Sequence, residues 1–178
     1  MSASPKKSPF RIEPAEEGDW PFIVQGQVEI AWARLDPERW RAVSRNDIEE
    51  RVARRVQQLR EDDGFPCLAF VASMDDGAQA GFVWVARTHN DSTGQLEASL
   101  LSQYVARLYR GRGLGHRLME TAEEWARQQA LPRISLSVGV RNLIGQRLYE
   151  SLGYQVETLR MTKKLGNLEP EDLHLSIY

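Results

Sequence analysis

The sequence contains a single cysteine, Cys67, and only three histidines in 178 residues. One cysteine cannot form an internal disulfide, which fits a reducing compartment, so we expect a cytoplasmic protein. The histidines, His89, His116 and His174, are too scattered along the chain to suggest a metal site. No metal ligand is therefore predicted, and Cys67, inside an apolar run, is expected to be a core residue rather than a nucleophile.

Long apolar runs and a strong charge imbalance are also absent. No run approaches the roughly 20 apolar residues of a membrane-spanning helix, and the Ser-, Pro- and Lys-rich residues 1–9 lack the apolar core of a signal peptide. The net charge of −2 argues against a dedicated nucleic-acid binder. We therefore expect neither a membrane nor a nucleic acid as partner. The hydrophobic fraction of 42% predicts a folded chain, with a flexible tail over 1–9 and a single domain over 10–178.

The near-neutral sum hides an uneven distribution of charge. Residues 1–94 carry 12 Lys and Arg against 16 Asp and Glu, whereas residues 95–178 carry 11 against 9. Four arginines and no acid fall within 107–117. A local basic cluster in a nearly neutral protein predicts a small anionic ligand rather than a polyanion.

Hydrophobic periodicity predicts an α/β (α+β) fold. The elements follow the order βααβββαβαβ, with a mixed central sheet of about six to seven strands flanked by four helices. Asn46 and Glu49 resemble a capping box at the start of the second helix. The expected strands are 10–14, 66–74, 78–88, 95–105, 134–138 and 154–165, and the expected helices are 20–32, 46–60, 114–131 and 142–152. The tail 166–178 alternates in polarity, which leaves open whether it adds an edge strand.

A glycine-rich loop lies between the strand 95–105 and the helix that follows. Its sequence is Arg110-Gly111-Arg112-Gly113-Leu114-Gly115. Alternate glycines allow tight turns and expose backbone N–H groups, and the helix N-terminus adds a positive dipole, so the loop is suited to phosphate oxygens. Arg110, Arg112 and His116 are candidates for additional contacts. A P-loop is excluded because His116-Arg117 follows Gly115 where Lys-Ser/Thr would be needed.

The spacing Arg-x-x-Gly-x-Gly at Arg110, Gly113 and Gly115 resembles the acetyl-CoA pyrophosphate loop of the GNAT family of N-acetyltransferases. A second segment, from Asn142 to Leu148-Tyr149-Glu150-Ser151-Leu152-Gly153-Tyr154, is similar to that family's Asn and Leu-Tyr-x-x-x-Gly-Phe/Tyr pattern. The resemblance extends over about Phe10 to Leu165 and implies the GNAT fold, with acetyl-CoA as co-substrate.

The helical spacing of the second segment supports a role in binding. Asn142 and Tyr149 are seven residues apart and share a face, with Gly145 or Gln146 between them, so a narrow ligand could lie there. Ile144, Leu148 and Leu152 are expected to face the core on the opposite side. Asn142 is also expected to be the N-cap of its helix.

The resemblance implies specific roles for residues in both segments. It assigns the leaving-group proton to Tyr149, and a backbone N–H near Val105 to the oxyanion that develops during transfer. The pantetheine part of acetyl-CoA would lie against the end of the strand at Tyr104 and Val105. The predicted donor-binding residues are Tyr104, Val105, Arg110, Gly111, Arg112, Gly113, Leu114, Gly115, His116, Asn142, Gly145 and Tyr149.

The general base is a separate question. Glu97 is the one acid in the run 95–105, and histone-type members of the family have their base at the corresponding point. Strand alternation is expected to put Glu97 on the same face as Val105. The alternatives are that Glu97 is a solvated side chain beside a turn and that a chain of water molecules takes the proton.

The leading interpretation is an N-acetyltransferase that moves the acetyl group of acetyl-CoA to a primary amine by direct transfer in a ternary complex. The alternatives are a catalytically idle acyl-CoA sensor and a protein N-terminal or lysine acetyltransferase. A small-molecule amine is the expected partner, and a homodimer is possible by family resemblance. Because the family builds its acceptor site partly from the first helices, Glu29, Trp32 and Asp36 are candidates for substrate contacts.

Overall fold

The computed structural model describes residues 9–62, 64 and 66–163. Five strands form one sheet in the order β1-β2-β3-β4-β5, in which β1 to β4 are antiparallel and β5 is parallel to β4. The strands are β1 (Phe10–Pro14), β2 (Cys67–Met74), β3 (Gln79–His89), β4 (Leu96–Val105) and β5 (Ile134–Leu136). The α-helices are α1 (Trp20–Arg34), α2 (Pro37–Ala42), α3 (Arg45–Glu61), α4 (Leu114–Gln128) and α5 (Leu143–Ser151), with short 3₁₀ helices η1 (Glu17–Asp19) and η2 (Arg107–Tyr109).

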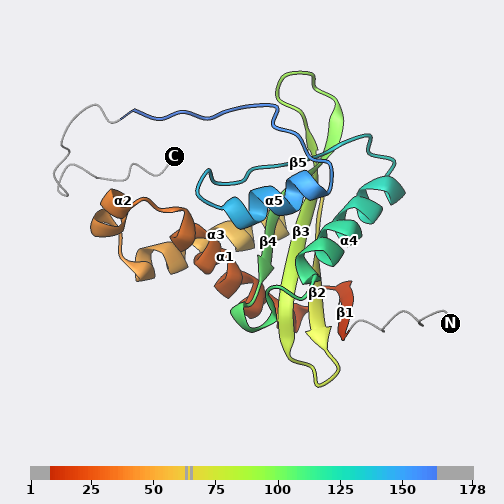
Figure 1. Cartoon of the computed structure of the whole chain (residues 1–178), viewed down its shortest axis with the longest axis horizontal. Coiled ribbons are helices and arrows are strands. Elements are labelled where there is room, and N and C mark those ends of the chain that lie inside the picture. Colours follow the sequence, from red (N-terminus) through yellow and green to blue (C-terminus); the bar gives the residue numbers. More distant parts are fainter. Residues whose placement is uncertain (1–8, 63, 65, 164–178) are drawn as a thin grey trace.

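Helices cover both faces of this sheet, which gives three layers (Figure 1). On one face α1 and α3 pack on the sheet through a cluster that includes Ile23, Val56 and Phe82. On the other face α4 packs through Leu118 and Met119, which are fully buried, and α5 packs beside it. The predicted α/β class is confirmed. None of the helices in the described ranges is long and apolar enough to cross a membrane.

The first helix lies close to the sheet because of a glycine. A Cβ added to Gly26 would lie 2.4 Å from Cε1 of Phe82 and 2.8 Å from Cδ1 of Tyr104. Any larger side chain would push α1 away from β3 and β4. The chain therefore needs glycine here for close packing rather than for an unusual backbone angle.

The sheet differs from the prediction at its C-terminal end. The expected strand 154–165 is wrong for residues 154–163, which form no strand, and residues 164–165 and the tail 166–178 lie outside the described residues. Val156 and Leu159 are exposed, so their apolar character is not matched by burial. A strand needs a neighbouring edge to pair its backbone groups, and alternation in sequence does not supply that edge. The described sheet therefore has five strands rather than six to seven.

Two helical features were also misassigned. The short helix α2 was not expected, and the capping box of α3 is formed by Ser44 and Asp47 rather than Asn46 and Glu49. The hydroxyl of Ser44 accepts a hydrogen bond from the Asp47 backbone N–H at 3.1 Å. The capping box therefore begins two residues earlier than expected, with a Ser-x-x-Asp pattern.

A bulge in β4 changes which side chains share a face. The pairing with β3 shifts between Trp84, opposite Ser102, and Val85, opposite Leu100, so Leu101 is an extra residue. Leu100 packs in the cluster under α4, whereas Leu101 packs in the cluster under α1. The bulge therefore reverses the in–out alternation for the second half of β4.

Candidate functional site

The glycine loop joins the end of β4 to the start of α4. Gly111 and Gly113 have φ angles of +73° and +77°, in the left-handed region that favours glycine. No atom outside the adjacent residues lies within 4 Å of a Cβ built on either glycine. The loop therefore has the turns that the sequence predicts, and its surface is open at both positions.

The N-terminus of α4 presents its first backbone N–H groups beside this loop. Gly113 is the N-cap and has no side chain, so α4 has no side-chain cap, and Arg117 N is bonded to Gly113 O at 3.3 Å. The amides of Leu114, Gly115 and His116 precede that bond. Leu114 is buried and anchors the turn in the core. Uncapped amides at the positive end of a helix favour an anion.

The four arginines of this region have different environments. Nε of Arg110 donates to the Val105 carbonyl at 2.9 Å, which folds Arg110 back onto the end of β4. The Arg112 guanidinium lies 5.7 Å from the ring centre of Tyr109. Arg117 donates to the Phe10 carbonyl at 2.9 Å and so links α4 to β1, and Arg107 is exposed in η2. Arg110 and Arg112 lie within the loop itself, as the sequence predicts.

An open strand edge lies next to the loop. β5 pairs with β4 only from Ala98 to Leu100, so β4 continues to Val105 without a strand partner on that side in the described structure. The Ala106 N–H donates to Ala80 on β3, so strand alternation turns the backbone groups of Val105 and Gln103 toward the open edge. An extended chain with amide groups could pair with β4 there.

Tyr149 of α5 lies on this side of the sheet. It is half-buried, and its hydroxyl donates to Oε1 of Gln103 at 3.1 Å. Burial raises the pKa of the Tyr149 hydroxyl above its ordinary value, while the nearby positive charge of Arg34 acts in the opposite direction with a smaller effect. Tyr149 is therefore protonated at neutral pH and can act as a proton donor.

The other predicted residues of α5 lie at its start. Asn142 is the N-cap, as expected, and its Oδ1 accepts from the Gly145 N–H at 3.0 Å. A Cβ at Gly145 would lie 2.5 Å from Nδ2 of Asn142, so this glycine makes room for the cap. The expectation for Ile144 is wrong, because it is 83% exposed. The core side of α5 consists of Leu148, Tyr149 and Leu152, so the expectation that Tyr149 lies opposite Leu148 and Leu152 is also wrong.

Two further donor-site predictions have specific surroundings. The side chain of Tyr104 packs against Phe22 and Phe82 under α1, so it faces away from the loop. The Nε2 of His116 lies 3.1 Å from the Ser151 hydroxyl, which links the first turn of α4 to the end of α5. The loop, the start of α4 and the face of α5 that includes Tyr149 are therefore brought together, while the Tyr104 ring is not part of this group.

Glu97 lies at the opposite end of β4. Its carboxylate accepts from the Ser135 hydroxyl at 2.9 Å and from the Asn90 amide at 3.3 Å. The expectation that it shares a face with Val105 is wrong, because the bulge at Leu101 lies between them. The β3 partners of Glu97 and Gln103, Thr88 and Val83, are five residues apart, so at about 3.3 Å per residue Glu97 lies about 17 Å along the strand from Gln103. Its role as the base stays a prediction.

The candidate acceptor residues all have partners in the α1–α3 region. Glu29 forms an ion pair with Arg45 of α3. The rings of Trp32 and Trp40 are stacked, with centres 6.3 Å apart. Asp36 accepts a hydrogen bond from the backbone N–H of Arg39 at 2.9 Å, at the start of α2. Their contact with a substrate stays a prediction.

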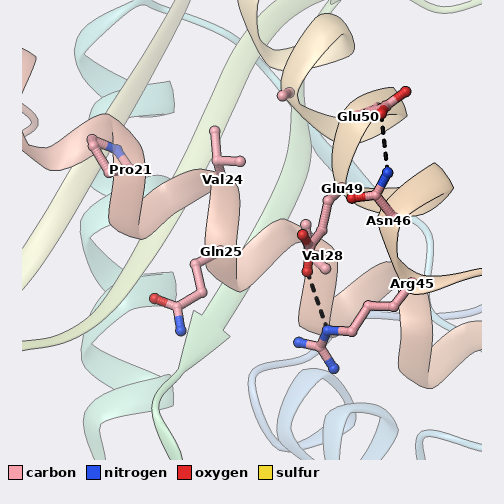
Figure 2. Close-up of a pocket in the computed structure, with 9 residues that line it drawn as sticks. Pro21, Val24, Gln25, Val28, Arg45, Asn46, Glu49 and Glu50 are labelled. Carbon is pink, nitrogen blue, oxygen red and sulfur yellow. Dashed lines mark hydrogen bonds and ion pairs between the residues drawn. The ribbon is translucent and has the colours of Figure 1, made fainter.

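A groove of about 580 Å³ lies elsewhere, between α1 and α3. Figure 2 shows Val24 and Val28 of α1 on one wall and Arg45, Asn46 and Glu49 of α3 on the other. Nε of Arg45 donates to Glu49 at 3.3 Å within this groove. The groove includes none of the predicted site residues and lies on the face of the sheet opposite α4.

Sequence reasoning did not identify Gln103 as a site residue. Besides bonding Tyr149, its Nε2 donates to the Gly115 carbonyl at 2.6 Å. The available signal was an amide side chain on a strand beside the loop. The bulge that turns this side chain toward α4 and α5 has no recognisable sequence pattern.

Comparison with known proteins agrees with this geometry. Residues 29–154 match the Acetyltransferase (GNAT) family. An aminoglycoside N(6')-acetyltransferase type 1 of Serratia marcescens is 34% identical in a 143-residue alignment that covers 76% of this chain and 92% of that protein. A mycothiol acetyltransferase of Nocardiopsis dassonvillei is 32% identical over 145 residues, 75% of this chain but 41% of that protein. The chain thus spans about two fifths of that relative's length.

Solved structures show the same fold. A Pyrococcus furiosus structure has a TM-score of 0.75 at 26% identity, and the match covers 88% of this chain and 99% of that one. The structure of AAC(6')-Iy in complex with the bisubstrate analogue CoA-S-monomethyl-acetylneamine has a TM-score of 0.64 at 16% identity, covering 87% and 97%. The second likeness bears on the fold alone.

Proposed function

Because the chain belongs to the GNAT acetyltransferase family, we propose that it transfers the acetyl group of acetyl-CoA directly to a primary amine while both substrates are bound. The observation that carries the proposal is the juxtaposition of three features on one side of the sheet. These are the left-handed glycines beside the uncapped start of α4, the open edge of β4, and the hydroxyl of Tyr149. The anion site would bind the pyrophosphate of acetyl-CoA, the strand edge would pair with its pantetheine arm, and the hydroxyl would protonate its sulfur.

The residues of the loop would bind acetyl-CoA, the acetyl donor. The amides of Leu114, Gly115 and His116 would bind the pyrophosphate, with Arg110 and Arg112 adding positive charge. The backbone groups of Gln103 and Val105 at the open edge of β4 would pair with the amides of the pantetheine arm, except the Val105 carbonyl, which already accepts from Arg110. Asn142 and Gly145 would border the arm. One of the two backbone N–H groups directed to this edge, that of Gln103 or of Val105, would donate to the oxyanion and the other would pair with the arm, because they are about 6.6 Å apart and cannot reach one oxygen together.

Tyr149 would supply the leaving-group proton. The amine nitrogen loses its proton and bonds to the acetyl carbon, the carbon–sulfur bond breaks, and the thiolate takes the proton of the tyrosine hydroxyl. Solvent then returns a proton to Tyr149. The amine proton would leave through water, because Glu97 lies about 17 Å along the strand from Gln103.

The position of Cys67 supports direct transfer. Its Sγ donates to the Leu59 carbonyl at 3.5 Å, in the α3 side of the protein, and the side chain packs in the cluster under α1. It is the one cysteine of the chain. A covalent acetyl-enzyme on a thiol at the loop therefore has no candidate residue.

The acceptor is proposed to be a small-molecule amine. The support is the names of two relatives, an aminoglycoside N(6')-acetyltransferase at 34% identity and a mycothiol acetyltransferase at 32%. Glu29, Trp32 and Asp36 are proposed as acceptor contacts. The acyl-CoA sensor and the protein acetyltransferase are the alternatives.

The test combines calorimetry with an assay of thiol release. CoA is titrated into the protein, and acetyl-CoA is then supplied with panels of small amines, lysine peptides and peptides with free N-termini. Thiol release that requires a small amine supports the proposal. Tight CoA binding without turnover would favour the sensor, and turnover with peptides alone would favour the protein acetyltransferase.

A further inference from the structure

Gln103 is the residue that links the two chemical parts of the site. It is on β4, after the bulge, and its side chain is directed toward α4 and α5. Its amide contacts Gly115, 12 residues later, and Tyr149, 46 residues later. Within the described residues, Gln103 is the one side chain of β4 whose hydrogen bonds reach both α4 and α5.

The chemistry of the two partners fixes the orientation of the amide. The Gly115 carbonyl can only accept a hydrogen bond, so Nε2 of Gln103 must face it, and the distance of 2.6 Å indicates a short contact. Oε1 therefore faces Tyr149, whose hydroxyl must be the donor of the 3.1 Å bond. Reversing the amide would place Oε1 against the Gly115 carbonyl, so that two acceptors would meet there.

Gly115 makes this contact possible. A Cβ at Gly115 would lie 3.2 Å from Cδ2 of Leu148 and 3.6 Å from Nε2 of Gln103. A side chain there would crowd the space in which α4, α5 and Gln103 meet. The third glycine of the loop thus allows the first turn of α4 to approach the amide closely.

We propose that Gln103 is a positioning residue that holds the hydroxyl oxygen of Tyr149 at a fixed place relative to the loop. This inference rests on the proposed function, because it concerns the proton donor of that reaction and the loop that would bind acetyl-CoA. Tyr149 would deliver its proton by turning the O–H about the C–O bond, while its oxygen stays where the ring and Gln103 hold it. The loop and the Tyr149 hydroxyl are then held in one fixed arrangement, so acetyl-CoA bound at the loop has its sulfur beside a correctly placed hydroxyl.

The first test is Gln103→Met, which keeps the side-chain length and removes both hydrogen bonds. We expect kcat to fall about 10-fold, because misplacement of a reacting group is costly, and the KM for acetyl-CoA to change less than about twofold. The matched control is Gln79→Met. The amide of Gln79 donates to Asp19 at 2.6 Å in a similar half-buried setting, and within the described residues it forms no hydrogen bond to the loop or to Tyr149. The control is expected to leave kcat unchanged.

The second test asks whether the effect passes through Tyr149. In a Tyr149→Phe background, Gln103→Met is expected to cause no further loss of kcat, because the hydroxyl that it positions is gone. Gln103→Glu keeps an acceptor for Tyr149 but lacks the donor for Gly115, and it is expected to be as impaired as Gln103→Met. Additive losses in the double variant, or full activity of Gln103→Glu, would overturn the proposal.

Calorimetry with CoA separates this proposal from the proposed function. If the wild-type chain neither binds CoA nor releases thiol, the proposed function fails. If it does both, and Gln103→Met binds CoA and unfolds at the wild-type temperature yet retains full kcat, only the positioning role fails. A variant with normal CoA affinity, normal unfolding temperature and reduced kcat supports the role of Gln103.

Discussion

Glu97 and Val105 belong to the same strand, yet their side chains lie on opposite faces of the sheet. The extra residue Leu101 between them reverses the alternation. Glu97 bonds Ser135 of β5, while Val105 packs in the cluster under α4. Simple alternation along the strand would place the Glu97 carboxylate on the same face as Val105, but the two side chains point to opposite faces and lie at opposite ends of β4.

This relationship predicts a small role for Glu97 in proton removal. Glu97→Gln is expected to leave the shape of the pH–rate profile unchanged, because Glu97 is about 17 Å along the strand from Gln103. The measurement is kcat/KM for the amine from pH 6 to about pH 10. Loss of an acid limb that the wild-type protein has would instead identify Glu97 as the base.

The loop glycines predict a loss of CoA binding that is separable from a loss of stability. Gly113 and Gly77 both have positive φ and open space around a would-be Cβ. Alanine at either position is expected to lower the free energy of unfolding by about 1 kcal/mol because of backbone strain. Only Gly113→Ala is expected to weaken CoA binding, since Gly77 lies in the β2–β3 turn. Equal CoA affinity of both variants, measured by calorimetry, would contradict the phosphate role of the loop.

Tyr149→Phe is expected to lower kcat about 100-fold with little change in the KM for acetyl-CoA. A proton donor acts while protonated, and its activity is lost as the pH rises through its pKa. Because burial raises the pKa of Tyr149, no loss of kcat from its deprotonation is expected below about pH 10. A basic limb near neutral pH that disappears in Tyr149→Phe would show that the pKa is lowered instead.

The contact between Gly145 and Asn142 predicts that Gly145→Ala changes the free energy of unfolding in opposite directions with and without the Asn142 side chain. Gly145→Ala is expected to destabilise the wild-type protein, because the new Cβ would displace the capping side chain of Asn142. Asn142→Ala removes the cap and is expected to cost about 1 kcal/mol. In that background the clash is absent, so Gly145→Ala should stabilise α5 by up to about 1 kcal/mol through helix propensity. Urea unfolding of the four proteins measures this, and additive effects would contradict the contact.

Much of this arrangement could be predicted from local patterns. The glycine spacing at 111–115 indicated the left-handed turns, and the stripe Leu114, Leu118, Ala122 indicated α4, because both depend on residues close in sequence. The bulge at Leu101 could not be predicted, since it depends on the register with β3. The exposure of Ile144 and the missing strand at 154–163 also depend on what packs beside them.

The central claim is direct transfer from acetyl-CoA to an amine at the loop and Tyr149. The most direct measurement is release of CoA thiol from acetyl-CoA, followed in the presence and absence of a panel of small amines. The account predicts steady release that requires an amine, without a burst when the amine is omitted. No release with any amine, or a burst of one thiol per protein without amine, would contradict it.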